Sequence, residues 1–392
     1  MGIEPQANFI AGEFGPAARG ARFSSSARRA ESWPQSSSED VAEAGRAAAS
    51  ACAAWRALAA ARRGELVCAM ARELERDSVL GVRLGERFQL DPAELALHFA
   101  GLEHGLGALF ARPASRAGGV AWCAPDWREL VRAPLVDLAR ELYAGRTAVL
   151  ISDARLPEVA ERFAVAAHEA GLPAGVLGLL HGATKELVTL ALASSREHGA
   201  RAAWGAAWGE AADDASAASH LVASGPVARM VELRRLCERQ GLADPRLRAL
   251  RCGTFEVSGQ LDSASALAEQ AGVVVAGAFG RGTTLTGQLP GALGRVFCPA
   301  RLFSRFSELL LERLETDAAA RAPVPQIDEE ASARVRAACE LGLDEGATCI
   351  AGGVREPDGD AVPPTLFTNV ETYMASARRQ DPLPVLCLLR GS

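Results

Sequence analysis

Hydrophobic and polar residues in the first part of the chain repeat with a helical period. Between residues 39 and 61, apolar side chains recur three and four positions apart, which predicts an amphipathic helix. Its apolar face consists of Val41, Ala44, Ala48, Cys52 and Trp55. The letters SSED at its start are a helix-start signal. Further helical patterns run to Glu75 and from Asp91 to Phe110, whereas residues 15–38 are rich in Ser, Ala, Gly and Arg and predict an irregular surface segment.

In the centre of the chain, short apolar runs alternate with amphipathic stretches. The apolar runs 146–151, 175–180 and 200–205 are strand candidates, and the stretches 156–171 and 184–199 between them are helix candidates. Strands separated by helices of this length predict right-handed crossovers and a parallel sheet. This part of the chain therefore predicts a Rossmann-like lobe.

The second half of the chain repeats this alternation. Apolar runs predict strands at 254–259, 293–302, 347–353 and 382–390. Amphipathic stretches predict helices at 263–279 and 304–315, and a further helix follows the proline-containing link at 322–328. The fold class is therefore α/β with two lobes.

The composition fits a globular protein of two or three domains. Of the 392 residues, 49% are hydrophobic and 23% charged, and the formal net charge is -6 without any basic run. A nucleic-acid partner is therefore not expected. No stretch approaches the roughly 18 apolar residues of a membrane helix, and no signal peptide is evident, so we expect a cytoplasmic protein without a membrane partner.

Cysteine and lysine usage limits the chemistry further. The nine cysteines are scattered singly, with neither a CxxC pair nor a Cys/His cluster at metal-ligand spacing, so no metal site is expected. Lys185 is the only lysine among 42 basic residues. A mechanism that needs a lysine at any other position is therefore excluded.

Several short motifs occur in an order that resembles the aldehyde dehydrogenase superfamily. They are NFIAGEF near the N-terminus, EAGLPAGVLGLLHG at 169–182, TFEVSG at 254–259, TGQLP at 286–290 and VPPTLFTNV at 362–370. Within the superfamily the chain is nearest to the succinylglutamate-semialdehyde branch. The resemblance implies an NAD-binding-type, Rossmann-like lobe at residues 1–255 and a truncated catalytic-type α/β lobe at residues 256–392.

The resemblance places Glu256 at the general-base position of the family. The position of the family's catalytic cysteine follows 34 residues later and is occupied by Pro290. A thiolate is the family's nucleophile, and its backbone N–H contributes to the oxyanion hole. Proline has neither a thiol nor a backbone N–H. The asparagine that supplies the second oxyanion donor corresponds to Asp126 or Trp127 in the stretch CAPDWREL, where Asp126 and Glu129 are interpreted as solvated loop charges.

The positions that hold the dinucleotide in the family also differ here. Ile151 and Ala154 replace a lysine and a glutamate that bind the adenosine ribose, and Gln380 replaces a glutamate that binds the nicotinamide ribose. In the family's phosphate-binding turn, matched to 203–210, Gly205 is retained as a cofactor-binding candidate. His181, at a strand end on the cofactor side, is a candidate ligand contact beside the ordinary interpretation as a structural histidine.

These substitutions favour a catalytically inactive aldehyde-dehydrogenase-like protein. Such a protein acts by binding a small molecule or a partner protein, and no cofactor is expected. The alternative is an NAD- or NADP-dependent oxidoreductase of an aldehyde or semialdehyde, with a relocated nucleophile at Cys298, eight residues past Pro290. Cys298 has apolar neighbours, and a buried core cysteine is the competing interpretation.

The resemblance also bears on self-association. The chain ends at Ser392 before the family's oligomerisation strand, and the segment between His104 and Gly118 is short for the family's projecting hairpin. We therefore do not expect the usual dimer of the family. A monomer, contacts through another surface, or pairing with an active relative are the alternatives.

Overall fold

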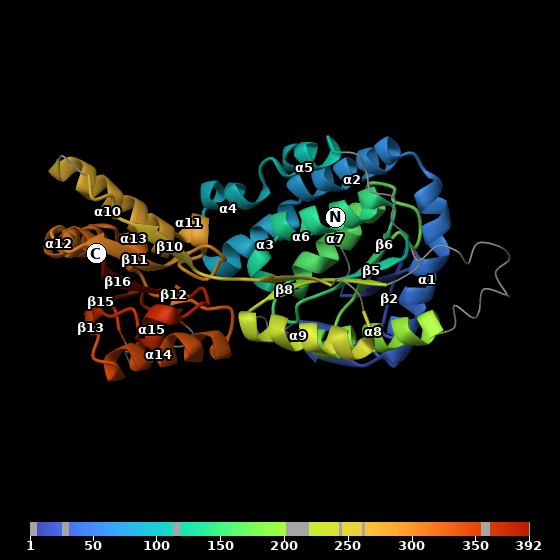
Figure 1. Ribbon diagram of the computed structural model, residues 1–392. Helices are drawn as coiled ribbons and strands as arrows, with labels where there is room; N and C mark the ends of the chain where they lie inside the picture. The colour runs from blue at the N-terminus through green and yellow to red at the C-terminus, as the bar shows by residue number, and fades with distance from the viewer. Residues whose placement is uncertain are drawn as a thin grey trace. The chain divides into compact units, whose positions relative to one another are not determined.

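The computed structural model of the protein describes residues 6–25, 31–112, 118–200, 219–242, 245–260, 263–353 and 361–391. The chain divides into two compact units (Figure 1). Unit 1 comprises residues 1–81 and 98–249, and unit 2 comprises residues 82–97 and 250–392. The boundary thus lies six residues before the one expected from the sequence, which was 255/256. No helix in these described ranges is long and apolar enough to cross a membrane.

Residues 82–97 belong to unit 2 although they lie far from its other residues in sequence. The Arg87 guanidinium donates to the backbone carbonyls of Gln326 and Ile327. Glu94 packs closely against Gly282, because a Cβ added at Gly282 would lie 2.9 Å from the Glu94 side chain. Such contacts depend on the tertiary structure, and local sequence patterns do not reveal them.

Unit 1 is built on a seven-stranded sheet in the order β2-β1-β7-β6-β5-β8-β9. Its strands and those of a separate hairpin are β1 (Asn8–Ile10), β2 (Glu13–Gly15), β3 (Arg22–Ser24), β4 (Ser32–Pro34), β5 (Val120–Ala124), β6 (Thr147–Ile151), β7 (Leu177–Leu180), β8 (His220–Gly225) and β9 (Arg246–Ala249). The strands from β7 to β9 are parallel, and β1 pairs antiparallel to β7. The chain runs β5-β6-β7 in one direction and then returns to β8 on the other side of β5, as in a doubly wound fold.

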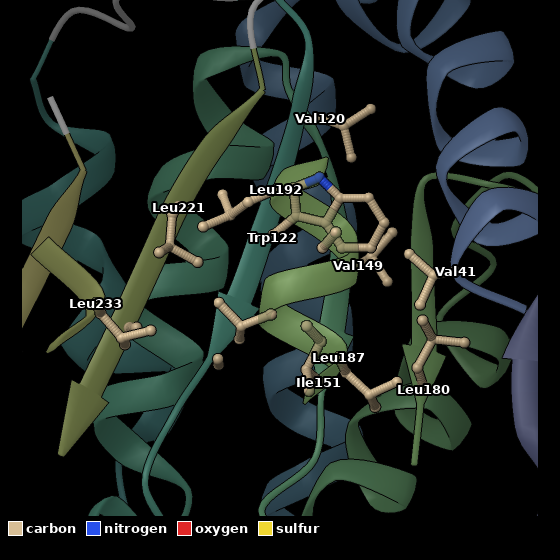
Figure 2. Packing of buried hydrophobic residues seen from close by; sticks show 14 of the residues in the cluster. Val41, Val120, Trp122, Val149, Ile151, Leu180, Leu187, Leu192, Leu221 and Leu233 are labelled. Atoms are coloured by element: carbon tan, nitrogen blue, oxygen red, sulfur yellow. The ribbon is translucent and has the colours of Figure 1, made fainter. Parts of the chain in front are cut away.

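Helices cover both faces of this sheet. They are α1 (Ser38–Ala57), α2 (Ala60–Glu75), α5 (Leu102–Phe110), η1 (Trp127–Glu129), α6 (Arg132–Ala144), α7 (Pro157–Glu169), α8 (Thr184–Ala200) and α9 (Val227–Gln240), while α3 (Ser78–Phe88) and α4 (Pro92–Phe99) contain the points where the chain passes between the units. One face is covered by α1, α8 and α9, whose apolar residues join the core around Trp122 and Val149 (Figure 2). The predicted helices at 156–171 and 184–199 and the predicted strands at 146–151 and 175–180 are thus confirmed.

Two parts of unit 1 differ from the expectation. The segment 15–38, predicted to be irregular surface, contains the β3-β4 hairpin and the completely buried Trp33, which packs on the His181 ring at 5.1 Å. The predicted strand at 200–205 lies outside the described residues except for Ala200, which ends α8. The next strand that the structure describes after α8 is β8, and the sequence analysis missed it.

Unit 2 contains a five-stranded sheet in the order β10-β11-β16-β15-β13. Its elements are β10 (Gly253–Glu256), α10 (Ala264–Phe279), α11 (Arg281–Thr284), β11 (Leu293–Pro299), α12 (Phe303–Thr316), α13 (Ala318–Arg321), β12 (Val324–Pro325), α14 (Glu329–Asp344), β13 (Thr348–Ala351), β14 (Ala361–Val362), β15 (Thr365–Val370), α15 (Ala375–Arg378) and β16 (Val385–Gly391). Only β13 is antiparallel to its neighbour. Helices α10 and α12 pack on one face and α14 on the other, so this unit is α/β as predicted.

The N-terminus of α1 is held by a capping box. The Asp40 carboxylate accepts hydrogen bonds from the backbone N–H and the hydroxyl of Ser37 at 2.7 and 2.8 Å. Its other oxygen accepts from the backbone N–H of Ala18 at 2.8 Å. One buried carboxylate thus joins the helix to the segment that follows β2.

We predict that Asp40→Ala lowers the free energy of unfolding of unit 1 by about 2 kcal/mol, because it leaves the backbone N–H groups of Ser37 and Ala18 without this acceptor. Urea denaturation followed by tryptophan fluorescence measures the change. Glu39→Ala is the matched control, since it removes an exposed ion pair with Arg19 from the same helix turn and costs under about 1 kcal/mol. Equal shifts for the two variants would contradict the role of Asp40.

Candidate functional site

The turn before β11 has a constrained backbone. Leu285 and Thr286 have φ angles of 45° and 50°, and Gly287 follows with 81°. The Thr284 hydroxyl accepts from the Gly287 N–H at 3.0 Å, and its carbonyl accepts from Leu289 N–H at 2.9 Å. A Cβ at Gly287 would lie 2.7 Å from Pro384 Cα, so the close approach requires glycine. These contacts fix the turn that ends at Pro290.

Strand pairing relates this turn to Glu256. The N–H of Gly291, next to Pro290, donates to Arg251 O at 2.9 Å, whereas Glu256 pairs with Phe297. At a rise of about 3.3 Å per residue, the five residues from Arg251 to Glu256 span up to about 16 Å. Glu256 is exposed and Pro290 partly buried. The backbone thus places the two predicted site residues at opposite ends of the β10-β11 pair.

Cys298 lies on β11 inside the core of unit 2. Its side chain is completely buried among apolar residues, including Phe306 and Leu386. Burial raises the pKa of the Cys298 thiol to about 11. Reactive cysteines need a thiolate and access to the reagent. This environment is therefore typical of a structural cysteine.

A second group of polar residues lies in unit 1, where strands β5, β6 and β8 end. Ligands of doubly wound folds bind beyond the carboxyl ends of the strands, at the point where the strand order reverses. In this unit that point lies between β5 and β8. The first residues past β5 include Asp126, whose side chain is completely buried, and Arg128, whose side chain is 4% exposed.

Asp126 is the acceptor for several basic groups. Both of its oxygens accept from Arg128 Nη1, at 3.0 and 3.2 Å. Arg155 donates to Oδ2 at 3.4 Å, and Arg229 lies 3.8 Å from the same oxygen. Three guanidinium groups therefore share one buried carboxylate, which supplies the charge compensation that buried ions require.

Asp153, just past β6, extends this cluster. Arg155 donates to both of its oxygens at 2.9 and 2.7 Å, and the Trp127 N–H donates to it at 3.3 Å. Burial would raise the pKa of this carboxyl, but the nearby guanidinium groups of Arg155 and Arg229 outweigh it and hold the pKa well below its ordinary value. Asp153 is consequently ionised at neutral pH.

Ser224 at the end of β8 closes the cluster on the other side of β5. Its hydroxyl accepts from the Asp126 N–H at 2.9 Å and donates to the Glu129 carboxylate. The Arg248 guanidinium forms ion pairs with Glu129 and Asp137, with N···O distances of 2.7 and 2.6 Å. Burial raises the pKa of Glu129, although Arg248 and Ser224 act in the opposite direction. The interpretation of Asp126 and Glu129 as solvated loop charges was wrong, because both side chains are buried and paired.

The other residues that the sequence analysis related to the family's cofactor site pack against or hydrogen-bond to other parts of the protein. Ile151 lies in the apolar core of unit 1, near Leu180 and Leu187 (Figure 2). The Gln380 side chain donates to the carbonyl of Arg378 at 3.1 Å. Burial lowers the pKa of His181 to about 3, and its Nδ1 lies 3.0 Å from the Ser152 hydroxyl. A neutral, fully buried ring of this kind fits the structural interpretation.

Gly205 lies outside the described residues, so its assignment stays a prediction. A strand–glycine–helix turn is nevertheless present at Gly225, between β8 and α9, with a φ of 154°. The sequence analysis missed it, although the apolar run HLVAS, the glycine and the amphipathic stretch up to Gly241 carry its signal. Arg229, in the first turns of α9, covers this glycine: a Cβ there would lie 2.9 Å from Arg229 Cδ.

Comparisons with known proteins agree with the fold. The family model "Aldehyde dehydrogenase family" matches residues 261–392. An α-ketoglutarate semialdehyde dehydrogenase of Haloferax volcanii is 28% identical over 284 residues, which cover 70% of this chain and 52% of the relative. The matched part thus spans about half the length of that curated relative.

Solved structures match nearly the whole chain. An NAD-dependent benzaldehyde dehydrogenase from Corynebacterium glutamicum superposes with a TM-score of 0.81 at 20% identity, covering 100% of this chain and 85% of that one. An indole-3-acetaldehyde dehydrogenase of P. syringae, in complex with NAD+, gives a TM-score of 0.79 at 21% identity, covering 99% and 80%. The chain has the fold of these aldehyde dehydrogenases, and its residues 261–392 match the model of that family. The predicted resemblance and fold class are thereby confirmed.

Among the described residues, the strand-to-helix turn at Gly225 leaves little room for a phosphate group. A pyrophosphate carries negative charge and binds at strand-to-helix turns that leave the backbone open. Here the space above Gly225 is filled by Arg229, and the carboxylates of Asp126 and Asp153 occupy the adjacent strand ends. In the described part of the chain, His, Cys, Asp and Glu also form no group of three that could hold a metal ion.

We predict that Asp153→Asn lowers the free energy of unfolding by about 3–5 kcal/mol at pH 7, because it leaves buried guanidinium charge uncompensated. The folded-state pKa of Asp153 is depressed, so its contribution is complete above the unfolded pKa of about 4 and is lost as the pH falls below it. Urea denaturation at several pH values should show the variant and the wild type converging in acid. Glu232→Gln is the control: it breaks an exposed ion pair with Lys185 and should change the free energy of unfolding little at any pH. A stability difference between Asp153→Asn and the wild type that persists in acid would contradict the role of the Asp153 charge.

Proposed function

We propose that this protein is a non-catalytic member of the aldehyde dehydrogenase superfamily that acts by binding a small molecule or a partner protein. The observation that carries the proposal is Pro290, which ends the constrained turn at the family's nucleophile position. The turn is specified by three successive residues with positive φ and by the contact of Gly287 with Pro384. The shape of the turn thus depends on backbone conformation and on the Gly287 contact, and no thiol stands at its end.

The surroundings of Cys298 support the same proposal. A relocated nucleophile has to reach the substrate as a thiolate. The Cys298 side chain is completely buried, and burial raises the pKa of its thiol to about 11. The alternative oxidoreductase would need this cysteine to leave the core between α10, α12 and β16.

The proposal predicts that the purified protein does not oxidise aldehydes. Short aliphatic, aromatic and succinylated semialdehydes, each with NAD and with NADP, should give no NAD(P)H absorbance above the no-enzyme rate. Robust turnover that Cys298→Ala abolishes would show a relocated nucleophile and establish the oxidoreductase instead. Turnover that survives Cys298→Ala would also contradict the proposal.

Restoring the cysteine alone should not restore activity. Pro290→Cys returns a thiol and a backbone N–H, but residues 124–128 contain no asparagine to supply the second oxyanion donor, which contributes about 3–4 kcal/mol. We therefore expect no measurable dehydrogenase turnover from Pro290→Cys under the same conditions. NAD(P)H formation above the no-enzyme rate would refute this expectation.

Thiol labelling tests the two cysteine positions directly. A pKa near 11 for Cys298 leaves about 100-fold less thiolate at pH 7 than an ordinary thiol has. The introduced cysteine of Pro290→Cys, at a partly exposed position, should therefore react with iodoacetamide at least about 100-fold faster than Cys298, as measured by peptide mass spectrometry. In urea the two rates should become similar, and comparable rates in the native protein would contradict the burial of Cys298.

A further inference from the structure

We infer that a cavity in unit 2, lined by α12, α13, β13 and the segment before β15, binds a primary alkylamine in its protonated form. The turn before Pro290 contributes no residue to this cavity. The inference therefore holds whether or not the protein oxidises aldehydes, and its failure would leave the proposed function to its own tests.

The cavity has the size of a small-molecule site. Its volume is about 590 Å³, within the range of about 300–1,000 Å³ that ligand pockets occupy. One wall comes from α12, where Leu314 and Glu315 follow Leu311 by three and four positions and therefore lie on the same side of the helix. Another wall comes from β13, through Ile350 and Ala351.

The wall at the end of β13 is fixed by contacts within the protein. Gly352 has a φ of 73°, and a Cβ at this position would collide with the Pro364 carbonyl oxygen. The Gly353 N–H donates to the Thr365 hydroxyl oxygen at 3.0 Å. The chain after β13 is thereby held against the start of β15, so the cavity does not need a ligand to keep this wall in place.

The cavity is apolar at its floor and open at its rim. Leu314 is 4% exposed and Pro364 is buried, whereas Glu315 and Ala318 are exposed. A ligand with an aliphatic chain can bury the chain against the floor and keep a polar head at the rim, where its hydration is largely retained.

The polar groups of the cavity favour a cationic head with hydrogen-bond donors. Pro323, Pro363 and Pro364 each contribute a backbone carbonyl but no N–H. The lining residues that the structure describes include no basic side chain. The Glu315 carboxylate is a lining group without a hydrogen bond or ion pair to any other described residue.

A protonated primary amine matches these groups. It carries one positive charge and three N–H donors, as the lysine ammonium does. Glu315 supplies the opposite charge, and the proline carbonyls supply further acceptors. A carboxylate of the same chain length would instead meet like charge and no basic partner, so the sign of the charge on the ligand distinguishes this site from a general apolar cavity.

The test compares hexylamine, hexan-1-ol and hexanoate, which share one chain length and differ in charge. Hexylamine is protonated at pH 7 because amines of this kind titrate near pH 10. In ligand-observed NMR titrations of the whole chain, hexylamine should bind with a dissociation constant of about 1 mM or below. Hexanol should bind about fivefold more weakly, and hexanoate should show no binding up to about 10 mM.

Two variants assign the binding to this cavity. Glu315→Gln should weaken hexylamine binding about fivefold, the effect of losing an exposed ion pair, and leave hexanol binding unchanged. Ala318→Phe places a ring at the rim and should weaken the binding of both ligands. Glu312→Gln is the matched control, because it removes an exposed carboxylate of α12 that does not line the cavity.

The inference is overturned if hexylamine does not bind, or if hexanoate binds as tightly as hexylamine. It is also overturned if Glu312→Gln weakens hexylamine binding as much as Glu315→Gln does, since attraction would then come from the general negative charge of the surface. Glu315 is exposed and without a partner, so Glu315→Gln should fold like the wild type and keeps the test decisive even if Ala318→Phe does not fold.

Discussion

The central constraint on unit 1 is that a buried carboxylate has to be compensated where three parallel strands end. Asp126 has no access to solvent and is surrounded by Arg128, Arg155 and Arg229. An unpaired ion at this depth costs several kcal/mol, so removing either sign of charge is destabilising. Through the Asp126 N–H and the Trp127 N–H, the same residues connect β5 to Ser224 on one side and to Asp153 on the other. The ends of β5, β6 and β8 are thereby held in register by charge as well as by the sheet.

Much of the fold could be predicted from the sequence because it is encoded locally. The apolar run at 146–151 became β6, the amphipathic stretch at 156–171 became α7, and Ser263 caps α10 at the predicted start. The assignment of residues 82–97 to unit 2 was not predictable in this way. It depends on Arg87 meeting carbonyls about 240 residues further along the chain.

The site was only partly predictable for the same reason. The motif TGQLP identified the turn before Pro290, because the letters of that turn are contiguous in the sequence. The ion network joins Asp126 to Arg155, 29 residues away, and to Ser224, 98 residues away. A loop aspartate without visible partners is normally solvated, so only the folded structure shows that Asp126 is buried. The turn at Gly225 was the exception, since its signal was present in the sequence.

The basic side of the network consists entirely of arginine, in a chain whose only lysine, Lys185, forms an exposed pair with Glu232. Guanidinium groups stay protonated throughout the physiological pH range and cannot act as proton donors there. The network can therefore be discharged only by acid acting on its carboxylates, and alkali leaves it intact. Amine-directed reagents and lysine acetylation likewise have no target within it, so its state is insensitive to the commonest charge-neutralising modification of basic residues.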